Sequence, residues 1–241
     1  MTLSFSRLSR ALSVSALLIL SSAVAENSAV TPAPRDANWV KRHEGFVEMA
    51  KKGGDVLFLG DSITDGWRGK GQAIWEKNYA PLNAINFGIG GDRTEHVLWR
   101  MQNGELEGLK PKAVVLMIGT NNTGNNRDGT PKNTNEEIAE GVTKIVQGLR
   151  TKLPGAKILL LAIFPRGEKE TPIRARLKEI NAKLAKLDDG KMIKYLDIGD
   201  KFLEADGTLS RDIMPDLLHP NDKGYQIWAD AIEQPLAALL K

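Results

Sequence analysis

Five short apolar runs, each four to six residues long, constrain the fold of this chain more than any other feature. They are rich in Val, Ile and Leu and show no polar alternation, so each run needs apolar cover on both faces. Segments with helical periodicity separate the runs, and crossover helices provide such cover in parallel sheets. The sequence therefore predicts an α/β fold, a three-layer α/β/α sandwich with strands at Val56–Leu59, Ala84–Phe87, Ala113–Ile118, Ile158–Ile163 and Met192–Leu196.

The segments between these runs carry helix start signals. Asp92 with Glu95, and Thr134 with Glu137, have the spacing of capping boxes, and Thr171-Pro172 has the composition of a helix start. Two more helices are expected, the first over about Asn38–Lys52 and the last around Tyr225, Trp228 and Ile232. Pro235 should bend or stop that last helix.

The first 25 residues have the features of a secretory signal peptide. Arg7 and Arg10 precede fifteen uncharged residues that end in Ala23-Val24-Ala25, which predicts cleavage after Ala25. The alternative is a membrane-spanning helix, but a span needs roughly 20 apolar residues and this stretch is shorter and contains four serines. We therefore expect a periplasmic or secreted protein without a stable membrane anchor, with residues 26–36 as a flexible tether and residues 37–241 as one domain.

Charge and cysteine content exclude several classes of protein. The leader holds two arginines and no acids, so its removal lowers the net charge from +3 to +1. No Lys/Arg cluster interleaved with aromatics remains, so nucleic acid is not an expected partner. The chain has no cysteine, which excludes disulfides, thiolate metal sites, a cysteine nucleophile and a lipoprotein anchor.

Glycine and polar residues follow three of the expected strands. Ligands of parallel α/β sheets bind beyond the carboxyl ends of the strands, and glycine lets the backbone approach a ligand closely. Taken singly, Ser62 is explained as a helix cap, Gly91 as a tight turn and Asn121 as a turn former. Their convergence at one sheet edge favours a site instead. The three runs are Gly60-Asp61-Ser62, Gly88-Ile89-Gly90-Gly91-Asp92 and Gly119-Thr120-Asn121-Asn122.

Three histidines are the candidates for a general base. His43 lies in the first expected helix and His96 in the helix after Gly91, so we expect both to be surface or packing residues. His219 lies in a loop three residues after Asp216, and an acid at this spacing can hold one ring nitrogen while the other accepts a proton. With Ser62 as nucleophile, the pair provides the base and its orienting acid.

These residues match a known family. Gly60-Asp61-Ser62-Ile63, Gly91, Asn121 and Asp216-x-x-His219 resemble, in order, the four signature blocks of the GDSL/SGNH hydrolases. The chain looks closer still to the catalytic subunits of intracellular platelet-activating-factor acetylhydrolase. The blocks that carry this closer resemblance are Asn86–Asp92, His96–Arg100, Asn103–Glu107, Gly119–Asn122 and Pro165–Glu168.

The resemblance implies a flavodoxin-like sheet of strand order 2-1-3-4-5 and a serine esterase that works without metal or cofactor. Ser62 would be the nucleophile, His219 the base and Asp216 its orienter. The backbone N–H groups of Ser62 and Gly91 and the side-chain amide of Asn121 would bind the oxyanion. A homodimer is compatible with the family, and family analogy is the only ground for it.

Two features separate this chain from the cytosolic acetylhydrolase subunits, namely the signal peptide and the longer polar segment Thr123–Asn133. Because secreted bacterial members of the family often deacetylate carbohydrates, we expect a short-chain, acetyl-type ester of a sugar or polysaccharide as substrate. A lipid ester is the alternative. Trp67 and Arg166 are candidate substrate-binding residues, although Trp67 is better explained as core.

Two alternatives use other chemistry. Asp61, Asp216 and His219 offer hard ligands for a divalent metal, and a carbohydrate-binding protein could retain the scaffold without turnover. No nucleotide cofactor is expected, because Arg93 replaces the third glycine of a dinucleotide fingerprint. Thr64 likewise breaks the G-x-S-x-G pattern of the α/β-hydrolase nucleophile elbow.

Overall fold

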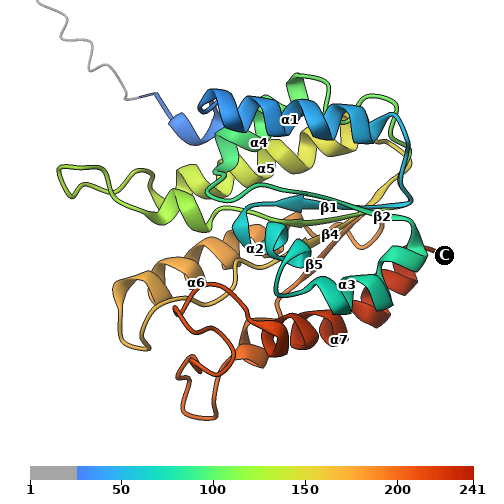
Figure 1. Cartoon of the computed structure of the whole chain (residues 1–241). Coiled ribbons are helices and arrows are strands. Elements are labelled where there is room, and N and C mark those ends of the chain that lie inside the picture. The colour runs from blue at the N-terminus through green and yellow to red at the C-terminus, as the bar shows by residue number, and fades with distance from the viewer. Residues whose placement is uncertain (1–25) are drawn as a thin grey trace, which may run out of the picture.

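A computed structural model describes residues 26–241, which form an α/β/α sandwich around one parallel sheet (Figure 1). The strand order is β2-β1-β3-β4-β5, as the family resemblance implies. Val56 at the start of β1 pairs with Ala84 of β2 and Ala113 of β3, so these strands begin and end level with each other. The strands are β1 Val56–Gly60, β2 Ala84–Gly88, β3 Ala113–Met117, β4 Lys157–Leu161 and β5 Ile193–Leu196.

Helices follow the strands on both faces of the sheet. The α-helices are α1 Ala37–Ala50, α2 Ser62–Asp65, α3 Gln72–Asn78, α4 Thr94–Gln102, α5 Asn135–Lys152, α6 Pro172–Leu184 and α7 Asp222–Leu239. Short 3₁₀ turns are η1 Ser28–Val30, η2 Gly66–Arg68, η3 Ala80–Leu82, η4 Thr120–Thr123, η5 Ala185–Leu187 and η6 Gly199–Phe202.

Two of the three helix start signals act as predicted. Thr134 accepts a hydrogen bond from the Glu137 backbone, and the Glu137 carboxylate accepts one in return from the Thr134 N–H. Helix α6 begins at Pro172 after Thr171. The prediction at Asp92 was wrong, because α4 begins two residues later at Thr94 and the Asp92 carboxylate is buried against side chains of α1 and α4.

Pro235 does not stop α7, which runs on to Leu239. A proline cannot donate to the carbonyl one turn earlier, but this helix packs its apolar side against the sheet on both sides of the proline. Trp228, Ile232 and Leu236 are all buried there. Tertiary packing therefore outweighs the missing hydrogen bond.

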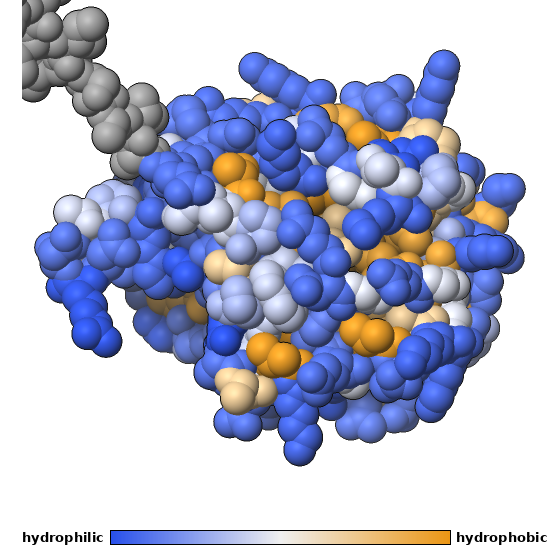
Figure 2. Space-filling view, turned by 90° about the horizontal axis from the view of Figure 1, so that it is seen from above, coloured by the Kyte–Doolittle hydropathy of each residue, from blue (hydrophilic) through white to orange (hydrophobic). Residues whose placement is uncertain are grey.

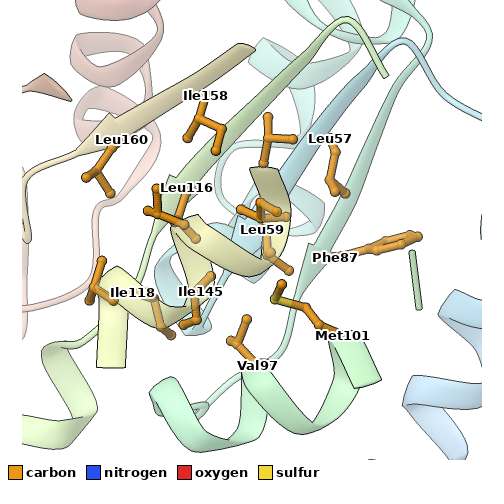
Figure 3. Packing of buried hydrophobic residues seen from close by; sticks show 14 of the residues in the cluster. Leu57, Leu59, Phe87, Val97, Met101, Leu116, Ile118, Ile145, Ile158 and Leu160 are labelled. Atoms are coloured by element: carbon orange, nitrogen blue, oxygen red, sulfur yellow. The ribbon is translucent and has the colours of Figure 1, made fainter. Parts of the chain in front are cut away.

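Each face of the sheet has its own apolar core, since successive side chains of a strand point to opposite faces. Leu57 and Leu59 of β1 pack with residues of α1, α4, α5 and α6, such as Met101 and Ile145 (Figure 3). Val56 and Phe58 pack instead on the face covered by α2 and α7. All five residues of β1 are buried, as the apolar run predicts for a central strand.

The sequence predicts residues 26–36 as a flexible tether, but in the structure this segment packs against the domain. Its residues carry η1 and lie against α4 and α5, with Ala29 fully buried. The Ala29 carbonyl accepts a hydrogen bond from Thr94 Oγ1 at 2.7 Å, and the Ala33 N–H donates to the Glu95 carbonyl. The polar composition did not indicate this packing, because backbone hydrogen bonds and one small buried side chain, Ala29, hold the segment. The predicted signal peptide, residues 1–25, lies outside the described residues.

The described surface is largely hydrophilic. Figure 2, seen over α1, shows charged side chains with small apolar patches between them. Within residues 26–241, Leu82 is the only large hydrophobic residue that is exposed. None of the helices in this part of the chain has the length and apolar character that crossing a membrane requires.

Candidate active site

Ser62 lies at the carboxyl end of the interior strand β1, where the chain turns directly into α2. The helix cap is Asp61, whose Oδ1 accepts a hydrogen bond from the Ile63 N–H at 3.0 Å. Ser62 is the first residue of α2, so its hydroxyl is not used as the cap. The structural explanation of this serine therefore fails, and its side chain is available for another contact.

That contact is His219. Ser62 Oγ lies 2.9 Å from His219 Nε2, and His219 Nδ1 lies 2.6 Å from Asp216 Oδ2. The three side chains form one hydrogen-bonded chain, although Ser62 and His219 are 157 positions apart. This geometry lets the imidazole take a proton from the serine while the carboxylate holds the ring and stabilises its positive charge.

The loop around His219 fixes this arrangement through the Asp216 carboxylate. Its Oδ1 accepts hydrogen bonds from the N–H groups of Leu218 and His219, at 3.1 and 2.7 Å, and Leu217 adopts a left-handed backbone with φ of 57°. Partial burial would raise the pKa of Asp216, but hydrogen bonds from the His219 ring and backbone outweigh it and hold that pKa below its usual value. Asp216 is therefore ionised when the imidazole needs it.

The glycine-rich loop after β2 passes over the serine. A Cβ placed on Gly90 would lie 3.9 Å from Ser62 Cβ, and Gly91 has a φ of 79° that favours glycine. Asn121 follows β3 and donates from Nδ2 to the Asp92 carbonyl at 2.8 Å. The loops that carry Ser62, Gly91 and Asn121 thus meet at one sheet edge, as the sequence predicts.

Asp61 is fully buried beneath the site. Its Oδ2 has no hydrogen-bond partner among the described residues. Burial raises the pKa of Asp61 to about 7, despite the hydrogen bond from Ile63, and the nearby Asp92 raises it further while Arg166 opposes the shift. A carboxyl group with this pKa changes charge near neutral pH.

The two candidate substrate-binding residues differ in outcome. Trp67 is only 1% exposed and packs among Tyr225, Trp228 and Tyr79, which confirms the preferred explanation as a core residue, and its candidate role as a substrate contact was wrong. Its indole lies in the core because η2 turns the chain back under the sheet. Arg166 is half-buried and donates to the Thr120 carbonyl and hydroxyl, both at 3.3 Å.

Arg166 lines an open cavity of about 400 Å³ that borders the Asp216–His219 loop. The insert after β3 forms part of its wall, where Asn125 and Pro131 pair in an antiparallel bridge. The other lining residues are Thr123, Gly124, Gly167, Glu168, Thr171, Ile173, Asp216, Leu217 and Leu218. This cavity borders the Asp216 end of the hydrogen-bonded chain and offers space for part of a substrate.

The expectation that His43 and His96 are surface or packing residues is met only as packing, because both are buried. His43 lies 3.4 Å from Glu105, and Glu105 accepts from Arg100 at 2.8 Å. Burial, with the nearby Arg93, lowers the pKa of His96 to about 3, so this imidazole is neutral and accepts a hydrogen bond from the Arg93 N–H.

Sequence reasoning missed the buried Arg100. Its guanidinium lies 3.1 Å from Asp92 and donates to the Phe87 carbonyl at 2.8 Å, so it fixes the glycine loop from inside. The available signal was its place among the apolar positions of α4, next to Val97 and Met101. Within the described residues, no group of three or more His, Asp or Glu side chains has the geometry of a metal site.

Comparison with known proteins agrees with this geometry. Residues 58–227 match the model of the GDSL-like lipase/acylhydrolase family. The human platelet-activating factor acetylhydrolase IB subunit alpha2 is 41% identical over 209 residues, which cover 86% of each chain.

Solved structures share the fold at lower identity. A putative acylhydrolase from Bacteroides fragilis superposes with a TM-score of 0.69 at 21% identity, over 86% of this chain and all of the other. The acetyl xylan esterase AlAXEase superposes with a TM-score of 0.62 at 23% identity, over 75% and 98% of the two chains. The fold is therefore shared with these structures, and the family match together with the 41% identical relative establishes that the chain belongs to the GDSL-like lipase/acylhydrolase family and is an ester hydrolase.

Proposed function

We propose that this protein hydrolyses short-chain, acetyl-type esters of carbohydrates through an acyl-enzyme on Ser62. The observation that carries the proposal is the continuous hydrogen-bonded chain from Ser62 through His219 to Asp216. A serine hydroxyl is too weak an acid to attack a carbonyl unaided, and this chain supplies the base and the orienting acid that it needs.

The reaction has two halves. Ser62 Oγ attacks the ester carbonyl and its proton passes to His219 Nε2, then the tetrahedral intermediate collapses and the alcohol leaves with that proton. A water molecule next attacks the acyl-enzyme, again giving its proton to His219. Collapse of the second intermediate returns the proton to Ser62 and releases the carboxylic acid. Asp216 keeps the imidazole oriented throughout.

The negative oxygen of both intermediates is assigned to three donors, the N–H groups of Ser62 and Gly91 and the amide of Asn121. Asn121 already donates one N–H to the Asp92 carbonyl, which leaves its second N–H free and holds the amide in a fixed orientation. Preorganised donors of this kind contribute strongly to acyl transfer, since loss of one costs roughly 10²–10³ in kcat.

The proposed acyl group is short. Among the relatives and fold neighbours, one is named an acetylhydrolase and another an acetyl xylan esterase, so their names share the acetyl group and differ in the alcohol. For the alcohol, the cavity that borders Asp216 has a mixed lining, with the polar side chains of Asn125, Arg166 and Glu168 beside the apolar ones of Ile173, Leu217 and Leu218. The polar side chains can hydrogen-bond sugar hydroxyls while the apolar ones pack against a sugar ring.

A lipid ester is the second candidate, because the 41% identical relative is named a platelet-activating factor acetylhydrolase subunit. The described surface argues against a long lipid tail. Its one exposed large hydrophobic residue, Leu82, precedes β2 and therefore lies at the opposite sheet edge from the serine. We further propose that the leader directs the protein to the periplasm or the medium, where polysaccharide esters occur.

The test uses p-nitrophenyl acetate with wild type and Ser62→Ala. We expect turnover by wild type, retained activity in EDTA, and at least a 10³-fold loss in the variant. An unchanged rate in Ser62→Ala, or loss of the wild-type rate in EDTA, would reject the serine mechanism. An acyl series from acetate to octanoate should favour acetate. Acetylated xylan beside platelet-activating factor then identifies the alcohol, and faster cleavage of the lipid would reject the carbohydrate assignment.

A further inference from the structure

Arg35, which lies just before α1, contacts the backbone of the glycine loop that follows β2. Its Nη1 donates a hydrogen bond to the Gly90 carbonyl at 2.7 Å. The peptide unit that contains this carbonyl also contains the Gly91 N–H, which is the proposed oxyanion donor. The guanidinium therefore binds the carbonyl end of the peptide group whose N–H end is the proposed donor.

A cation on a peptide carbonyl has two effects on the N–H across the bond. It polarises the amide, and linked hydrogen bonds strengthen one another, so the N–H becomes a better donor to a developing negative charge. It also fixes the peptide plane. Gly90 and Gly91 have no side chains to restrict their backbone, so this peptide would otherwise rotate more freely than most.

Arg35 is itself held in place. The same Nη1 lies 3.2 Å from Asp92 Oδ1, and a Cβ on Gly91 would lie 3.2 Å from this nitrogen, so the guanidinium packs directly over the loop. Its side chain is 31% exposed, which leaves the charge only partly hydrated. Behind it, the buried Ala29 and the Ala33 hydrogen bond to Glu95 anchor the segment that delivers the arginine.

We propose that Arg35 is a positioning residue that orients and polarises the Gly91 N–H for the oxyanion. The inference rests on the proposed role of Gly91, and it gives the N-terminal segment a part in the reaction. Because Arg35 acts on the donor and not on the bound ester, its loss should reduce transition-state binding and leave substrate binding unchanged.

The experiment compares Arg35→Met, Arg35→Gln and Arg35→Lys with p-nitrophenyl acetate. Met removes charge and donor, Gln keeps a neutral donor, and Lys keeps a charged one. We expect kcat to fall about tenfold in Arg35→Met, less than the 10²–10³ of a lost donor because the N–H itself remains. Arg35→Lys should stay within about threefold of wild type and Arg35→Gln should lie between. KM should change less than twofold in all three variants. An alkyl boronic acid forms a tetrahedral adduct on the serine, so its inhibition constant should rise in parallel with the loss in kcat.

Arg93→Gln is the matched control. Arg93 follows the same loop and has similar exposure, but its guanidinium pairs with Glu95 at 2.8 Å and does not contact the Gly90 carbonyl. Its replacement by Gln therefore removes one positive charge, as Arg35→Gln does, and leaves that carbonyl unaffected. We expect its kcat to stay within twofold of wild type. Unchanged kcat in Arg35→Met, a matching loss in Arg93→Gln, or a loss that appears in KM would overturn the inference. Failure of the proposed function is separate, because it would appear as an inactive wild type or an active Ser62→Ala.

Discussion

At the scale of single residues, Asp61 makes the stability of the fold depend on pH. This carboxyl group caps α2 with one oxygen and leaves the other buried without a partner among the described residues. Burial raises its pKa to about 7, well above the usual value of an aspartate, so the folded protein holds the proton over a pH range in which the unfolded chain releases it. Folding is consequently opposed by ionisation of this group as the pH rises.

We expect Asp61→Asn to remove this dependence on pH. Between about pH 4 and pH 7 the folded wild type binds more protons than the unfolded chain, so its free energy of unfolding should fall relative to the variant, by about 4 kcal/mol at most. Above pH 7 the difference should level off. Urea unfolding of both proteins at several pH values measures it, and groups common to both cancel. A difference that is constant from pH 4 to pH 8 would show that Asp61 titrates normally.

Trp67 lies near the site in sequence but contributes to the core. Its position beyond a strand end suggested a binding role, which its burial rules out. We expect Trp67→Ala to lower the free energy of unfolding by about 3–5 kcal/mol, the usual cost of emptying a buried aromatic site. In Trp67→Phe, which keeps most of the packing, KM for p-nitrophenyl acetate should stay within twofold of wild type. A large rise in KM with little change in stability would restore Trp67 as a substrate contact.

At the scale of secondary-structure elements, two helical glycines differ in what surrounds them. A Cβ on Gly45 of α1 would meet nothing within 4 Å, whereas one on Gly141 of α5 would lie 2.6 Å from Thr94 Oγ1 and 2.7 Å from the Ala29 carbonyl. Gly141 therefore leaves room for the N-terminal segment to cross the helix. Helix propensity alone would favour alanine at both positions.

We expect Gly45→Ala to raise the free energy of unfolding by about 0.5–1 kcal/mol, the normal gain in a helix interior. Gly141→Ala should lower it by about 1–3 kcal/mol, because the added methyl overpacks the contact between Thr94 and Ala29. The urea midpoints of the two variants give the comparison. Stabilisation of Gly141→Ala equal to that of Gly45→Ala would mean that the segment does not pack on α5 in solution.

The elements were largely predictable because their signals are local. The apolar runs located all five strands to within two residues at each end, and Thr134 and Thr171 marked true helix starts. Asp92 failed as a cap because Trp39, which is far away in sequence, and Arg100, eight residues further on, compete for its carboxylate. Pattern reasoning contains no information on such partners.

At the scale of the whole molecule, the contacts that sequence reasoning missed are likewise those between residues far apart in the chain. The sequence pointed to Ser62, Asp216 and His219 because family blocks and strand-end topology place them at one edge, and the structure brings their side chains into one hydrogen-bonded chain. The buried cluster of His43, Arg100 and Glu105, and the packing of residues 26–36, depend on which helices lie side by side. A polar segment with two prolines has the composition of a linker. Only the folded protein shows that residues 26–36 form hydrogen bonds with α4 and with the glycine loop.

The N-terminal segment therefore allows a test of the molecule as one unit. We expect replacement of residues 27–35 by glycine and serine to lower the melting temperature by several degrees, since the contacts of Ala29 and Arg35 to α4 and the glycine loop are lost. The same replacement should lower kcat about tenfold, because the Gly91 N–H loses its orienting cation. Restoring Arg35 alone within the replaced segment should recover part of kcat and little of the melting temperature, which separates its effect on the oxyanion donor from the packing of the segment. If the replaced chain kept wild-type stability and rate, residues 26–36 would be the passive tether that their composition suggests.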